Sequence, residues 1–209
     1  MKKGVAGKAI HRKDYQPYPW LLDRAQFRFE IGDESTRVQA ELDFRRNLEG
    51  GGPEEQSRGG IELDGQNMEL VSLALDERTL REDEYTVSAD KLVVHDAPES
   101  CRLSLEVLIK PHENTALEGL YPSGQFLLTQ CESEGFRKIC YFPDRPDVMT
   151  CYEVTVVADR GRYPVLLSNG NAVASGSLDD GRHWVRWDDP FAKPGVLVAR
   201  GGGGLGWVG

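Results

Sequence analysis

The chain has 209 residues, of which 39% are hydrophobic, and its formal net charge is −9. This length and apolar content suffice for a real core, which excludes a chain that is disordered throughout. The basic residues are scattered among acids, which argues against nucleic-acid binding because phosphates need clustered Lys and Arg. No stretch approaches the ~20 apolar residues of a membrane span, and the N-terminus lacks the apolar run of a secretory signal. We therefore expect a soluble, cytoplasmic protein, with an organellar location left open if upstream sequence is missing.

Short segments in which apolar and polar side chains alternate run through the chain. Residues 26–31 show this two-residue period, and residues 37–44 repeat it after a turn at 32–35. The two segments predict an antiparallel hairpin. Further strands are predicted at 71–75, 92–94, 102–109, 126–130, 152–158, 165–168 and 183–187. Because no amphipathic helix longer than a turn or two is indicated, the pattern predicts an all-β fold, an antiparallel β-sandwich with short helical turns only.

Two segments are rich in glycine instead. Residues 49–60, EGGGPEEQSRGG, lie between two predicted strands and indicate a mobile surface loop. A linker between two domains is the less favoured alternative, since one hairpin is too little structure to stand alone. Residues 195–209 lead into a glycine tract that cannot bury enough surface to order itself, so we expect a disordered tail after a single β domain at 11–194.

The cysteines and histidines give no sign of a metal site. The four cysteines, Cys101, Cys131, Cys140 and Cys151, contain no Cys-x-x-Cys pair and no zinc-ligand spacing, so free thiols are expected. His112 and Glu113 could begin a His-Glu-x-x-His zinc motif, but position 116 is alanine. We interpret His112 as an exposed loop residue. Cys131 has no histidine nearby to activate it, which favours a passive buried thiol over a nucleophile.

An acidic cluster follows the predicted strand at 126–130. Its members are Glu132, Glu134, Asp144 and Asp147. A pair of carboxylates at the right distance would suit glycoside hydrolysis. Arg137 and Arg145 stand among these acids, however, and favour the alternative of ion pairs with a turn at 143–146.

Four separated motifs point to a family. They are NTALEGLY at 114–121, TQCESEGFRKICYFPDRPDV at 129–148, YPVLLSNGN at 163–171 and GRHWVRWDDPFAKP at 181–194. In this order they closely resemble the N-terminal domain of bacterial-type aminopeptidase N, or alanyl aminopeptidase, a gluzincin metallopeptidase family. The resemblance extends from about residue 11 to residue 194. It implies a saddle-shaped β-sandwich that packs on a thermolysin-like catalytic domain.

The resemblance also implies roles for two residues of the second motif. Gln130 is similar to a residue that lines the family's first specificity pocket, and Glu132 to a carboxylate that holds the free amino terminus of the substrate. The chemistry agrees, because only the α-ammonium distinguishes a chain end from a chain middle. A fixed carboxylate can bind that group through charge-assisted hydrogen bonds.

The residues that cut peptides in this family do not occur in the sequence. Its zinc ligands, His-Glu-x-x-His with a distant glutamate, and its Gly-x-Met-Glu-Asn motif are absent. We therefore expect a truncated chain with no catalytic residue, no bound metal and no activity alone. Zinc would belong to a missing catalytic domain, which would be the intramolecular partner. The peptide's amino terminus would be the ligand of the complete enzyme, with no role for nucleic acid or membrane.

Two other functions stay open. The chain could be a non-catalytic β-sandwich that binds a partner, which would expose the apolar surface used for that contact. A glycosidase that uses Glu132 and Glu134 is the least favoured reading, because a carboxylate pair alone is a weak signal.

Overall fold

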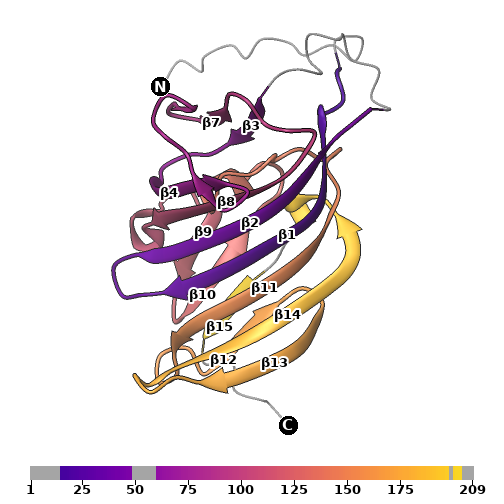
Figure 1. Cartoon of the computed structure of the whole chain (residues 1–209). Helices are drawn as coiled ribbons and strands as arrows, with labels where there is room; N and C mark the ends of the chain where they lie inside the picture. Colours follow the sequence, from indigo (N-terminus) through magenta and orange to yellow (C-terminus); the bar gives the residue numbers. More distant parts are fainter. Residues whose placement is uncertain (1–14, 49–59, 198–199, 204–209) are drawn as a thin grey trace.

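The computed structural model describes residues 15–48, 60–197 and 200–203. Its strands form three sheets, and the two larger ones lie one behind the other (Figure 1). Apart from Gly60, the predicted loop at 49–60 lies outside the described residues, as do the first residues of the family resemblance. The architecture is all-β, as predicted.

The largest sheet has eight strands in the order β13-β14-β11-β1-β2-β8-β4-β5. Their bounds are β1 (Trp20–Ile31), β2 (Thr36–Arg46), β4 (Glu69–Leu75), β5 (Arg78–Thr79), β8 (Ser100–Ile109), β11 (Thr150–Asp159), β13 (Asn171–Ser177) and β14 (Arg182–Lys193). The predicted hairpin is confirmed: β1 and β2 pair antiparallel, with Phe27 opposite Ala40 and Phe29 opposite Val38. These four side chains are buried, because alternate residues of each strand face the core.

A four-stranded sheet in the order β12-β15-β10-β9 covers one face of the large sheet (Figure 1). Its strands are β9 (Gly119–Ser123), β10 (Phe126–Gln130), β12 (Val165–Ser168) and β15 (Arg200–Gly203). Leu120, Leu127 and Leu166 point from this sheet into the same hydrophobic core that holds Phe27. The two sheets therefore form a sandwich around one core.

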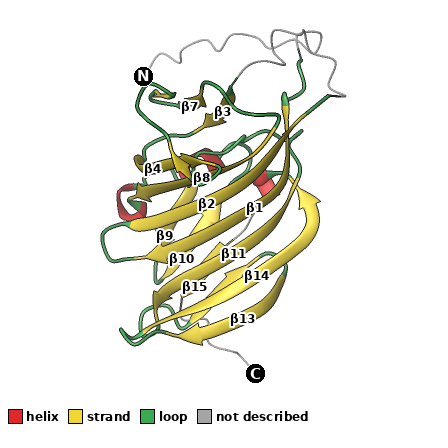
Figure 2. Ribbon diagram, viewed as in Figure 1, coloured by secondary structure: helices red, strands yellow, loops and turns green. Residues whose placement is uncertain are grey.

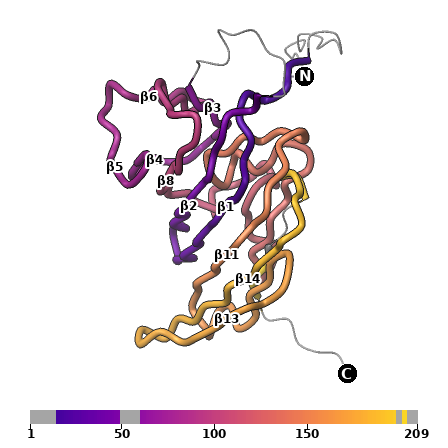
Figure 3. Tube along the Cα trace, turned by 45° about the vertical axis from the view of Figure 1, so that its right-hand side comes forward, coloured from indigo at the N-terminus to yellow at the C-terminus, as the bar shows by residue number. Residues whose placement is uncertain are grey.

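A three-stranded sheet, β3-β7-β6, projects at one side of the sandwich (Figure 3). Its strands are β3 (Ile61–Asp64), β6 (Tyr85–Val87) and β7 (Lys91–Val94). The end of β3 is tied to the segment that precedes β11, because Asp64 and Phe142 exchange backbone hydrogen bonds of 2.9 and 3.0 Å. This link matters for the candidate site.

Helical structure is limited to short turns within the described residues (Figure 2). These are the 3-10 helices η3 (Pro111–Glu113), η4 (Phe136–Lys138) and η5 (Gly195–Leu197). None of the helices in this part of the chain is long and apolar enough to cross a membrane.

The prediction of disorder over residues 195–209 is wrong for the residues of that range that the structure describes. Residues 195–197 form η5, and residues 200–203 form β15. β15 lies between β10 and β12, with Gly202 opposite both Leu127 and Leu166. Backbone pairing on both edges orders this strand, so it needs no apolar side chains of its own. Residues 198–199 and 204–209 lie outside the described part.

Candidate functional site

Residues 129–148, here called the motif segment, connect β10 to β11. Phe136 and Phe142 are fully buried, and their ring centroids lie 4.5 Å apart. Both rings contact Phe27 of β1, at 5.3 and 6.0 Å. Edge-to-face and tilted ring contacts of this kind stabilise aromatic clusters beyond simple area burial. The large sheet therefore anchors the motif segment at its centre.

Gln130 and Glu132, here called the exposed pair, lie at the start of this segment. Gln130 is the last residue of β10, and both side chains are exposed to solvent. The Nε2 atom of Gln130 donates to the backbone oxygen of Glu132 at 3.3 Å. Cys131 between them is buried, as predicted for a passive thiol, and the peptide bond after Glu132 is cis. Two exposed polar side chains therefore flank a buried thiol in the sequence.

Two glycines fix the backbone of the exposed pair. Gly119 of β9 lies opposite Gln130 and has a φ of +76°, and a Cβ added there would lie 2.7 Å from the Cβ of Lys138. Gly135 donates its N–H to the carbonyl oxygen of Cys131 at 2.9 Å, and a Cβ added there would lie 2.4 Å from the Gln130 oxygen. Only glycine permits such close contacts at these positions. The backbones of β9, β10 and the turn before η4 are therefore packed directly against one another.

The four acids of the segment differ in their partners. Asp144 accepts from Nε of Arg137 at 3.1 Å, and Glu134 lies 3.4 Å from Nη1 of the same side chain. Asp147 accepts from Arg145 at 2.8 Å. These contacts confirm the predicted ion pairs.

Glu132 differs from the other three acids. Within the part of the chain that the structure describes, its carboxylate makes no hydrogen bond and no ion pair, and only its backbone oxygen accepts one. The turn predicted at 143–146 lies slightly later, at 145–148, where the N–H of Val148 donates to the carbonyl oxygen of Arg145 at 3.3 Å. Of the four acids, Glu132 is the one whose carboxylate is unpaired in this part of the chain.

Two carboxylates contact Arg137, and of these Asp144 is buried and Asp64 is partly buried. Burial raises the pKa of Asp144 above its ordinary value, and the hydrogen bonds from Arg137 offset only part of this effect. Burial likewise raises the pKa of Asp64, against the attraction of Arg137 and Lys91. Sequence reasoning missed this cluster, because nothing local indicates that Asp64 meets residues about 80 positions further along.

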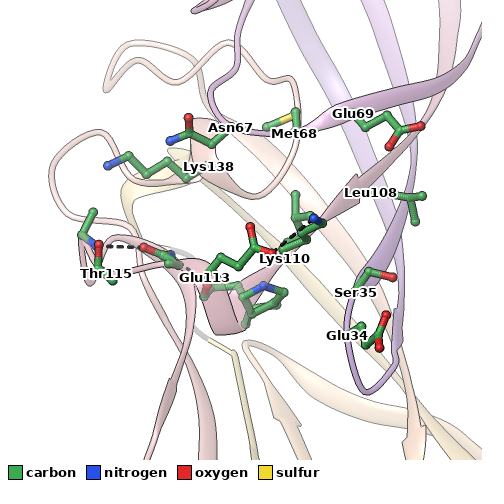
Figure 4. Close-up of a pocket in the computed structure, with 15 residues that line it drawn as sticks. Glu34, Ser35, Asn67, Met68, Glu69, Leu108, Lys110, Glu113, Thr115 and Lys138 are labelled. Carbon is green, nitrogen blue, oxygen red and sulfur yellow. Dashed lines mark hydrogen bonds and ion pairs between the residues drawn. The ribbon is translucent and has the colours of Figure 1, made fainter.

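A separate pocket of about 740 Å³ lies beside η3 (Figure 4). Lys138 and Asn67 stand on one side of it, and Glu34 and Ser35 on the opposite side. Neither member of the exposed pair lines this pocket. The basic side chains of its lining are already paired, Lys110 with Glu113 at 3.2 Å and Lys138 with Glu118.

Zinc does not fit the residues that the structure describes. His112 is exposed, as expected, although it lies in η3 rather than in an irregular loop. No group of three or more His, Cys, Asp or Glu in the described ranges is placed to hold a metal ion. A stable zinc site needs at least three such ligands.

The sandwich and the motif segment define an N-terminal domain of the M1 peptidases. The chain belongs to the Peptidase M1 N-terminal domain family, whose model matches residues 26–197. It is 48% identical over 198 residues to aminopeptidase N of Caulobacter vibrioides, covering 95% of this chain and 22% of that protein. It therefore spans about a fifth of the length of this relative.

Solved structures agree with this assignment. Aminopeptidase A of Legionella pneumophila, in complex with aspartic acid, superimposes with a TM-score of 0.87 at 33% identity, over 93% of this chain and 22% of that chain. The M1 zinc metallopeptidase of Deinococcus radiodurans shares the fold with a TM-score of 0.72 at 14% identity, over 90% of this chain and 43% of that chain.

Proposed function

We propose that this chain is the substrate-anchoring domain of a zinc aminopeptidase that releases N-terminal amino acids from peptides. The observation that supports this most is the exposed, unpaired carboxylate of Glu132 beside three paired acids. In this proposal Glu132 binds the α-ammonium of the substrate. Gln130, whose amide is held by the Glu132 backbone, forms a wall of the pocket for the first side chain.

The chemistry of an α-ammonium explains why one carboxylate is useful here. A hydrogen bond to a charged group contributes about 1.5 to 3 kcal/mol, which suffices to favour a free amino terminus over an internal peptide. The same interaction is equally present before and during bond cleavage. Glu132 would therefore contribute to binding rather than to the rate of the chemical step.

Cleavage is proposed to require a further, catalytic domain. Such a domain would provide the zinc ligands, and zinc when bound would polarise the scissile carbonyl and activate a water molecule. The described residues of this chain offer no metal group, and the chain spans 22% of its Caulobacter relative. The pure 209-residue chain should not hydrolyse an alanyl chromogenic substrate, with or without added zinc. Measurable zinc-dependent hydrolysis would contradict this.

The binding role can be tested on the chain itself. L-alaninamide carries the α-ammonium, and N-acetyl-L-alaninamide is the matched compound without it. In an NMR titration we expect L-alaninamide to shift the amide signals of residues 130–135, and the acetylated compound to shift them much less. Glu132→Gln should abolish the difference, whereas Glu134→Gln should retain it. An equal response to both compounds would reject the proposed role.

A second candidate function is a non-catalytic interaction module. Two large apolar side chains favour it, because Phe191 of β14 and Leu197 of η5 are 76% and 60% exposed. A contiguous apolar patch marks contacts with another protein or domain, and these two side chains would contribute to one. A clean monomer in size-exclusion chromatography, without binding of a hydrophobic dye, would count against this function.

The cytoplasmic location stays a prediction.

A further inference from the structure

Arg137 joins three stretches of chain behind the exposed pair. It lies in η4, and its side chain is 17% exposed. Its guanidinium is 3.1 Å from Asp144, 3.4 Å from Glu134 and 3.8 Å from Asp64. Because Asp64 ends β3, this single side chain connects the small sheet with both halves of the motif segment.

The backbone of Arg137 is held as well. Its N–H donates to Oδ2 of Asp144 at 3.1 Å, and its carbonyl oxygen accepts from the N–H of Gln66 at 2.7 Å. A fourth side-chain contact runs from Nη2 of Arg137 to the carbonyl oxygen of Asp144 at 3.2 Å. The planar guanidinium carries five N–H donors in a fixed fork, so it can make more such contacts at once than the three donors of a lysine. All three residues of η4 are therefore held, Arg137 by these contacts, Phe136 by the aromatic cluster and Lys138 by its ion pair with Glu118.

The residue that precedes η4 contacts the backbone of the exposed pair. Gly135 immediately precedes η4, and its N–H donates to the carbonyl oxygen of Cys131. It also packs so closely on the Gln130 backbone that a Cβ would overlap the Gln130 oxygen. A shift of η4 would therefore move the backbone on which Gln130 and Glu132 stand.

We propose that Arg137 is a positioning residue, which holds η4, and through Gly135 the exposed pair, in the orientation that binds an α-ammonium. This rests on the proposed function of Glu132. Arg137 touches no ligand in this proposal. Its effect on binding comes from the geometry that it imposes, and a site loosened by a small displacement loses much of its affinity.

Three variants separate positioning from general stability. Arg137→Gln leaves buried Asp144 without its cation, which is strongly destabilising. The double variant Arg137→Gln with Asp144→Asn removes both charges, so most of the stability should return. Val107→Ala, in the fully buried core of β8, is the control that lowers stability without touching the motif segment. If Arg137→Gln alone does not fold, the double variant provides the test.

Two measurements on the chain follow from this design. The first is amide hydrogen exchange of Gly135, which reports local opening of the turn; we expect it to be about tenfold faster in the double variant. The second is the dissociation constant for L-alaninamide from the NMR titration, which we expect to rise about threefold or more in the double variant. Val107→Ala should change neither quantity at temperatures where it is folded.

The outcomes distinguish the two proposals. The positioning role is overturned if Gly135 exchanges in the double variant at the wild-type rate. It is also overturned if the affinity for L-alaninamide returns to the wild-type value together with stability. A wild-type chain that shows no Glu132-dependent response to L-alaninamide would reject the proposed function instead. In that case the exchange of Gly135 still decides whether Arg137 holds the exposed pair.

Discussion

The eight-stranded sheet and the motif segment share one core but are stabilised differently. In the sheet, every second residue of long strands is buried, so many equivalent side chains such as Val38 and Leu42 contribute. The motif segment has little regular structure and depends on two aromatic rings, one partly buried arginine and two close glycine contacts. The sheet therefore has redundant support, whereas a single substitution should displace the motif segment while the sheet remains folded.

The largest expected effect comes from the aromatic anchor that both regions share. Phe136→Ala should lower the free energy of unfolding by about 3 to 5 kcal/mol, because it removes a fully buried ring that contacts Phe27 and Phe142. Urea unfolding followed by circular dichroism measures this loss. Leu103→Ala in β8 is the comparison within the sheet. A loss below about 1 kcal/mol for Phe136→Ala would show that the segment is not anchored there.

The glycine contacts provide a matched pair of substitutions in one hairpin. Gly119 and Gly124 both have positive φ, +76° and +60°, so alanine costs about 1 kcal/mol or more at either position. A Cβ at 124 meets nothing within 4 Å, whereas one at 119 would lie 2.7 Å from Lys138 Cβ. Gly119→Ala should therefore cost about 1 to 3 kcal/mol more than Gly124→Ala. Equal unfolding free energies for the two variants would show that the close packing at Gly119, opposite Gln130, does not contribute to stability.

The pH dependence of stability should have opposite signs in the motif segment and in the small three-stranded sheet. Burial raises the folded-state pKa of Asp144, so its contribution to stability is fully present below pH 3.8 and is lost as the pH rises through the raised value. As the pH rises from 3 to 7, the stability of Asp144→Asn should thus increase relative to that of the wild type. In Glu84, next to β6, the hydrogen bond from Arg78 lowers the pKa to about 2.

The contribution of Glu84 is therefore present above pH 4.5 and is lost as the pH falls toward 2. Glu84→Gln should lose stability relative to wild type at neutral pH, and this difference should vanish in acid. Unfolding free energies of the three proteins between pH 2 and 7 check both signs. The same sign for both variants would contradict the assigned causes.

The contrast between the two regions also explains which strands can be predicted from the sequence. Strands with a clear two-residue period, such as β1, β2 and β8, are predicted because the pattern reflects burial of one face. β13, Asn-Ala-Val-Ala-Ser-Gly-Ser, and the glycine strand β15 lack that pattern and are ordered by backbone pairing with their neighbours. Tertiary context decides such strands, and the local sequence does not carry it.

The site shows the same division. The residues alone give four acids and no reason to select one, and it is the family resemblance that selects Glu132. The structure adds that Asp144, Glu134 and Asp147 are paired while Glu132 is not, in the part of the chain that it describes. The contact between Arg137 and Asp64 joins β3 to a turn far along the chain, so no periodicity or spacing could have indicated it.

The most direct test of the central claim is a KM measurement. Residues 15–197 would replace the matching part of the Caulobacter vibrioides aminopeptidase N, and the active chimera would be assayed with an alanyl chromogenic substrate. Glu132→Gln should raise KM by about tenfold, the equivalent of one charged hydrogen bond, while Glu134→Gln changes it by less than about twofold. An unchanged KM for Glu132→Gln, or an equal rise for both variants, would contradict the assignment of Glu132 as the group that binds the amino terminus.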